Sequence, residues 1–263
     1  MLLTKIDQMV EFIKKNKQAG FPEIGKALNW KPKNVERVAR ILERAGVLDI
    51  HYSINPAAKP FITLKQVQKT PEESAPTGKP VDNYVIKDPM ESYDIATVDI
   101  NYSEEDKRDR YFIHLPKLSP CSRAYLEYIK SETAKKLPLS AAEKTKEEMK
   151  KDLEERMKVV KNFINTELEP EQDVLNIMTT IAMNEMYGLG DIELLVADRN
   201  LEEIVINSSR VPVSVYHRKL GWLKTNIVLK DEEESENYSS QIARKVGRQV
   251  TILNPILDAH LVT

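Results

Sequence analysis

The chain has 263 residues, of which 41% are hydrophobic and 30% charged, and its formal net charge is -2. No stretch approaches the roughly 18 apolar residues of a membrane-spanning helix, and Met1-Leu2-Leu3 is too short for the apolar core of a secretory signal. The single cysteine, Cys121, excludes a disulfide within the chain and indicates a reducing compartment. We therefore expect a cytoplasmic protein, peripheral at a membrane only through a partner.

Charge is distributed unevenly. Residues 1–69 contain 13 Lys and Arg against 6 Asp and Glu, whereas residues 70–263 contain 26 against 35. This asymmetry indicates a basic module joined to an acidic one, in a chain long enough for two or three domains.

Residues 1–69 predict three helices followed by two strands. Thr4 can cap the first helix, Pro22 suits the first turn of the second, and Pro32 begins the third. The strands, Val47–Tyr52 and Phe61–Leu64, flank a proline-containing loop. This order resembles a winged helix-turn-helix module.

The third helix carries polar donors on its outward side. They are Lys31, Lys33, Asn34, Arg37 and Arg40. A helix that reads a DNA groove needs donors near its N-terminus, which makes this surface a candidate for contact with nucleic acid or a partner protein. Glu36 and Glu43 share the surface and would repel phosphate, so we favour protein docking or scaffolding over DNA binding.

Residues 70–83 are rich in proline and poor in apolar side chains, and they predict a linker. Residues 84–186 predict a strand pair, Asp94–Ile100 and Arg110–Leu115, and then helices. The helices are expected from Leu118-Ser119-Pro120, from Ala141 to Glu167 after a Ser140/Glu143 capping box, and from Pro170 to Gly188.

Residues 187–263 predict a small α/β domain with an antiparallel sheet. A glycine-rich phrase precedes a hairpin of Val211–His217 and Trp222–Leu229, and an amphipathic helix follows over Ser235–Val246. The expected class is therefore α+β: an α-rich winged helix, a region of strand pair and helices, and this last domain.

Three phrases of this last region carry a family resemblance. They are YGLGDIELLVAD at 187–198, LEEIVINSS at 201–209 before the hairpin, and PILDAHLVT at 255–263. In this order they resemble the second N-terminal domain of the type II/type IV secretion, pilus and archaellum motor ATPases, including archaeal secretion ATPases. The likeness extends more loosely back to Tyr84. In that family the last phrase continues into a Gly-x-Arg-Val strand and a Walker-type motor domain.

The resemblance implies a hexameric enzyme that binds ATP and Mg in its motor domain. It implies that the N-terminal region gates the nucleotide cleft, contacts its own motor domain and neighbouring subunits, and docks on a membrane platform protein. Residues 1–263 contain no Gly-x-x-x-x-Gly-Lys-Ser/Thr phosphate loop, so we expect this chain alone to have no catalytic residues, no cofactor and no ATPase activity. Two alternatives stay open: a winged-helix transcription regulator that binds DNA, and a scaffold without a motor.

Arg244 and Arg248 form a basic cluster with Lys245 in the last predicted helix. Our hypothesis is that these two arginines lie near the nucleotide and help the domain close on a loaded motor, although basic residues at a helix C-terminus are also favourable on their own. The four histidines lie far apart, without Cys or carboxylate at ligand spacing, so we expect no metal site.

Overall fold

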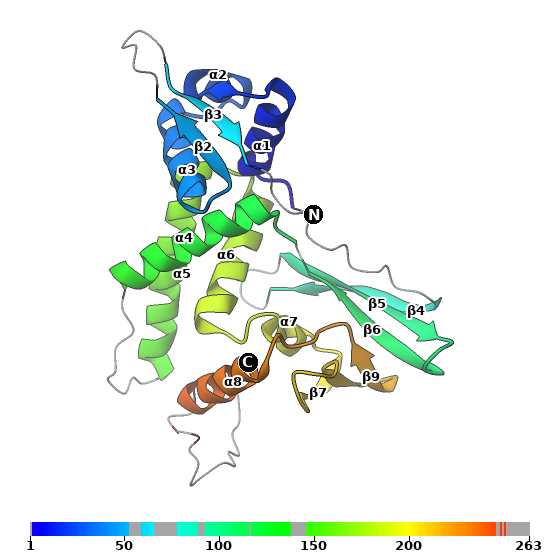
Figure 1. The fold of residues 1–263 in the computed structure, drawn as a ribbon. Coiled ribbons are helices and arrows are strands. Elements are labelled where there is room, and N and C mark those ends of the chain that lie inside the picture. The colour runs from blue at the N-terminus through cyan, green and yellow to red at the C-terminus, as the bar shows by residue number, and fades with distance from the viewer. Residues whose placement is uncertain are drawn as a thin grey trace. The chain divides into compact units, whose positions relative to one another are not determined.

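A computed structural model of the chain describes residues 2–52, 59–65, 78–88, 93–115, 117–137, 146–245, 248 and 250 (Figure 1). The described residues form helices and two sheets, which confirms the expected α+β class. The chain divides into two compact units. The first unit is Met1–Glu72 with Lys117–Ala182, and the second is Glu73–Pro116 with Met183–Thr263.

The first unit begins with three helices and a three-stranded antiparallel sheet in the order β1-β3-β2. The elements are α1 (Lys5–Asn16), β1 (Ala19–Gly20), α2 (Phe21–Ala27), α3 (Pro32–Arg44), β2 (Leu48–His51) and β3 (Phe61–Leu64). Thr4 caps α1, since its Oγ1 accepts from the N–H groups of Ile6 and Asp7. The three predicted helices and two predicted strands are confirmed, and β1 is an addition; the winged-helix classification stays a prediction.

Two further helices, α4 (Pro120–Lys136) and α5 (Lys146–Leu168), belong to the first unit, and α6 (Gln172–Tyr187) follows. The predicted boundaries at 69 and 84–186 do not match this division. The reason is a set of buried polar contacts to the N-terminal helices: Ser122 of α4 is fully buried, and its Oγ lies 2.8 Å from Thr4 Oγ1. The predicted capping box of Ser140 and Glu143 lies outside the described residues.

The second unit contains one six-stranded sheet in the order β4-β5-β6-β9-β8-β7. The strands are β4 (Lys79–Lys87), β5 (Asp94–Ser103), β6 (Arg108–His114), β7 (Leu201–Val205), β8 (Ser214–His217) and β9 (Gly221–Thr225). β4 begins inside the predicted linker, which is therefore wrong for Lys79–Asn83; residues 70–77 of that linker lie outside the described part of the chain.

The predicted strand pair and the predicted C-terminal antiparallel sheet are parts of this one sheet, which corrects the expected architecture. β6 and β9 pair in parallel, with Arg110 beside Lys224 and Tyr111 beside Thr225. Beyond β9, Asn226 continues the pairing with its side chain, since Oδ1 accepts from Ile113 N at 2.8 Å and Nδ2 donates to Ile113 O at 3.0 Å. The sheet is therefore mixed.

One face of this sheet carries the core of the second unit. The buried strand residues of this face include Val98, Ile100, Tyr111, Val215 and Leu223. Residues of α7 (Ile192–Ala197) and α8 (Glu232–Lys245) pack in the same cluster. Residues of the opposite parity, such as Trp222 and Lys224, point to the other face and are exposed.

The glycine-rich phrase packs closely against α8. Gly190 has a φ of +55°, and a Cβ at this position would lie 2.9 Å from the Tyr238 hydroxyl oxygen. That hydroxyl donates to Glu234 Oε1 at 2.8 Å. The backbone conformation favours glycine here, and a Cβ would also displace the Tyr238 hydroxyl.

We predict that Gly190→Ala destabilises the protein more than Gly221→Ala. Gly221 has a φ of +73°, and a Cβ added there would meet no heavy atom within 4 Å. The Gly221→Ala substitution therefore measures the conformational cost alone, about 1–2 kcal/mol. Overpacking against Tyr238 should add roughly 1–3 kcal/mol to Gly190→Ala. Urea unfolding measures both, and Tyr238→Phe in the Gly190→Ala background should recover part of the loss. Equal losses at the two glycines would contradict this packing constraint.

Candidate functional site

The predicted contact surface of α3 is largely occupied by the chain itself. Four of its five donors contact carboxylates or a carbonyl of the first unit. Lys31 Nζ lies 2.8 Å from Glu169 Oε1, and Asn34 Nδ2 lies 2.9 Å from the Thr166 carbonyl oxygen. Arg37 Nε lies 2.9 Å from Glu167 Oε1, and Arg40 Nη2 lies 2.7 Å from Glu36 Oε1. Lys33 is exposed. Three of the four partners lie at the end of α5, which therefore docks on the N-terminal part of α3.

Glu167 is the centre of this docking contact. The residue is 2% exposed, its Oε2 accepts from the Tyr125 hydroxyl at 3.1 Å, and its backbone carbonyl accepts from Trp30 Nε1 at 2.7 Å. Burial raises the pKa of the Glu167 carboxyl, and the Arg37 charge and the Tyr125 hydrogen bond oppose this rise only in part. The contact thus joins α3, α4 and α5 at one buried carboxylate.

The structure does not test the hypothesis for Arg244, in α8, and Arg248, which follows this helix. The side chain of Arg244 lies outside the described residues. Arg248 is exposed, and its backbone N–H donates to the Ala243 carbonyl at 2.8 Å. Their proximity to a nucleotide stays a prediction.

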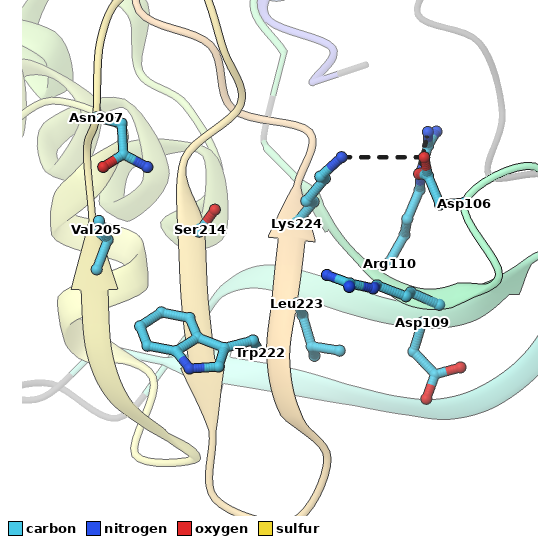
Figure 2. Close-up of a pocket in the computed structure, with 10 residues that line it drawn as sticks. Asp106, Asp109, Arg110, Val205, Asn207, Ser214, Trp222, Leu223 and Lys224 are labelled. Carbon is cyan, nitrogen blue, oxygen red and sulfur yellow. Dashed lines mark hydrogen bonds and ion pairs between the residues drawn. The ribbon is translucent and has the colours of Figure 1, made fainter.

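A hollow that no sequence pattern indicates lies on the open face of the second unit's sheet. The hollow has a volume of about 310 Å³. Its lining comes from β6, β7, β8, β9 and the hairpin before β6, as Figure 2 shows: Asp106, Arg108, Asp109, Arg110, Val205, Asn207, Ser214, Trp222, Leu223 and Lys224. The parallel pairing of β6 and β9 places Arg110 directly beside Lys224, a neighbourhood that local sequence patterns do not reveal.

The hollow combines positive charge with an exposed aromatic ring. The Asp106 carboxylate pairs with Arg110 and lies 4.0 Å from Lys224 Nζ. Arg108 is exposed and has no ion pair among the described residues. Trp222 is 49% exposed, and its ring system packs edge-on with Tyr216, with centroids 5.3 Å apart. The hollow therefore offers both ligand-binding chemistry and space.

On the core side of the sheet, two tyrosines share one buried carboxylate. The hydroxyls of Tyr84 and Tyr111 donate to Asp198 Oδ2 at 2.6 and 2.7 Å. Burial is the main cause that raises the pKa of both tyrosines. The next cause is the hydrogen bond to Asp198 for Tyr84 and the negative charge of Asp198 for Tyr111. The cluster ties β4 and β6 to the turn between α7 and β7, and we assign it a structural role.

Other chemistry is not evident in the part of the chain that the structure describes. No three His, Cys, Asp or Glu side chains gather there in a way that could hold a metal ion. Burial raises the pKa of the Cys121 thiol to about 11, so at neutral pH it is protonated and a poor nucleophile. None of the described helices combines the length and the apolar composition that crossing a bilayer requires.

No protein-family model matches the chain. Similar proteins occur in Methanocaldococcus jannaschii. Uncharacterized protein MJ1288 is 28% identical over 167 residues, which are 64% of this chain and 66% of that protein. Uncharacterized protein MJ0781 is 42% identical over 73 residues, which are 28% of this chain and 10% of that protein. Uncharacterized protein MJ0900 is 35% identical over 81 residues, which are 31% of this chain and 14% of that protein. The chain thus spans less than two thirds of each of these relatives.

We predict that Glu167 makes stability depend on pH. The pKa of Glu167 is raised in the folded protein, whereas in the unfolded chain it is about 4.3. Above about pH 4.3 the folded protein therefore keeps a proton that the unfolded chain loses. The contribution of Glu167 to stability falls as the pH rises from about 4.3 through the folded-state pKa. Unfolding free energies from urea titration should show wild type losing stability relative to Glu167→Gln over this range. Glu11→Gln, at an exposed carboxylate of α1, controls for removal of one negative charge. A wild-type-to-Glu167→Gln difference that is constant with pH would contradict the prediction.

Proposed function

We propose that this chain is a non-catalytic regulatory and docking region of a hexameric secretion or pilus-assembly ATPase. The motor class rests on the resemblance of residues 187–263, and ATP and Mg would bind in the motor domain of the full-length protein. Two relatives support a modular role, because the segment similar to this chain makes up only 10% and 14% of those proteins. The partners would be the motor domain, neighbouring subunits and a membrane platform protein.

The packing of the second unit supports a role in gating a nucleotide cleft. Its core includes residues of one continuous sheet and of two helices, and the Asp198 cluster ties separate strands to the α7–β7 turn. The contact of Gly190 with Tyr238 fixes the glycine-rich phrase to α8. Such a unit can transmit motion as a rigid body when a neighbouring domain changes state.

The observation that carries docking over DNA binding is the pairing of α3 with α5. Lys31, Asn34 and Arg37 already contact the end of α5, and Glu167 in that contact is 2% exposed. DNA binding by these side chains would compete with these contacts, and withdrawal of Arg37 would leave the buried Glu167 carboxylate without its cationic partner, which is costly. Helix α3 therefore serves as an internal docking site, which favours a scaffold role for the first unit.

We expect only weak, non-specific binding of duplex DNA, with a dissociation constant of about 10⁻⁴–10⁻⁶ M at physiological salt. Fluorescence anisotropy with a labelled duplex, repeated from low to high salt, measures this. The informative variants are Lys33→Gln and Arg40→Gln, because neither side chain pairs with α5 within the described part of the chain. Tight binding that is lost in both variants but kept in Lys219→Gln would favour the transcription-regulator alternative.

The motor class has its own test in the native polypeptide continued beyond Thr263. We expect a Gly-x-Arg strand and then a phosphate loop within about 60 residues. In that longer protein, the double substitution Arg244→Gln and Arg248→Gln should lower the ATPase rate by about tenfold, with Arg199→Gln as an exposed control. Absence of a phosphate loop would overturn the motor class. An unchanged ATPase rate would leave the class standing and remove the two arginines from the nucleotide site.

A further inference from the structure

We propose that the hollow on the open face of the second unit's sheet binds a small anion that carries a flat aromatic ring, of the class of the nucleoside monophosphates. The ring would stack on Trp222, and the anion would lie between Lys224 and Arg108. This inference stands independently of the proposed motor function and involves no hydrolysis. It concerns different residues from the arginine pair at the end of α8.

The first argument is the aromatic platform. Trp222 projects from β9 and, as Figure 2 shows, its indole extends across β8 toward Val205 of β7. Almost half of the residue is exposed, while Tyr216 packs against it at an interplanar angle of 76°. Tyr216 thus restrains the indole and leaves ring surface available inside the hollow. Stacking on such a surface accepts any flat ring and is a common mode of base recognition.

The second argument is the charge beside this platform. The sheet register places Arg110 next to Lys224, and Arg108 lies two residues earlier on the same strand and therefore on the same face. Ser214 is paired with Lys224 across β8 and β9, and Asn207 follows β7. Three cationic side chains, two neutral hydrogen-bonding side chains and the carboxylates of Asp106 and Asp109 therefore line one space, with an excess of one positive charge. The cationic and neutral side chains are the donor set that a phosphate or carboxylate requires.

Asp106 acts as an internal counter-ion in the same place. Its carboxylate pairs with Arg110 and lies 4.0 Å from Lys224 Nζ, while Arg108 keeps no ion pair among the described residues. The side chains of Asp106 and Arg110 are 22% and 34% exposed, so an arriving anion can reach them. A ligand phosphate would compete with the Asp106 carboxylate for Lys224. Removal of the carboxylate charge should therefore strengthen ligand binding.

Size and charge select a single nucleotide over a nucleic acid strand. The volume of about 310 Å³ is at the lower end of the range of roughly 300–1,000 Å³ for small-molecule sites, which suits one ring with one anionic group. The second unit contains 14 Lys and Arg against 22 Asp and Glu, so its net negative charge does not favour the many phosphates of a strand. The positive charge is local to the hollow.

Tryptophan fluorescence offers a direct measurement on the full chain. The chain has two tryptophans, and Trp30 is 2% exposed in the first unit, so quenching by added ligand reports mainly on Trp222. Titration with AMP at low salt should show saturable quenching with a dissociation constant of about 0.1–1 mM. Calorimetry provides the second readout for Trp222→Ala, which removes the reporter and should abolish binding. Urea midpoints confirm that each variant is folded.

The variants test the two halves of the site separately. Lys224→Gln should weaken AMP binding about tenfold and Asp106→Asn should tighten it about threefold, while Lys219→Gln, at an exposed lysine between β8 and β9, should leave it unchanged. Adenosine should bind much more weakly than AMP. The proposal is overturned if AMP quenching does not saturate, if adenosine binds as well as AMP, or if Asp106→Asn weakens binding. Tighter binding of a short single-stranded oligonucleotide than of AMP would overturn the assignment to a mononucleotide.

Discussion

The buried carboxylate of Glu167 determines what the first unit can present to other molecules. Its side chain and backbone bring together α3, α4 and α5 through Arg37, Tyr125 and Trp30. Once this carboxylate is out of water, its partners cannot leave it without a large desolvation cost. Arg37 and Lys31 at the N-terminal part of α3 are thereby paired within the unit, although both side chains remain more than half exposed. The same contact links the N-terminal helices to α4 and α5 within the first unit.

In the second unit the corresponding constraint is the parallel pairing of β6 with β9. This pairing joins two segments more than a hundred residues apart, and the side chain of Asn226 extends it where the backbone ladder ends. Because side chains alternate along strands, the register that buries Tyr111 and Thr225 on the core face also brings Arg110 and Lys224 together on the open face. The stability of the sheet and the chemistry of the hollow thus follow from one register.

Local chemistry is sufficient to predict many elements. The Thr4 cap, proline at the start of α3 and the turn that contains Gly221 act within a few residues, and the structure confirms the helices and the hairpin that they indicate. Long-range partners leave no such signal. Trp30 reads locally as part of a turn, although its indole N–H is bonded to a carbonyl 137 residues away. The hollow cannot be predicted from the sequence for the same reason, because its lining comes from segments that only the sheet topology brings together.

Net charge is the least informative sequence property for locating a site. The composition of residues 70–263 indicates an acidic module, yet the hollow on the open sheet face gathers Arg108, Arg110 and Lys224. Interactions between exposed charges weaken over about 8 Å at physiological salt, so a ligand in the hollow responds mainly to the groups beside it. Asp106 is one of these groups and holds part of the positive charge in an internal pair. The electrostatic character of this face is therefore decided by which strands are adjacent, and composition alone cannot supply that.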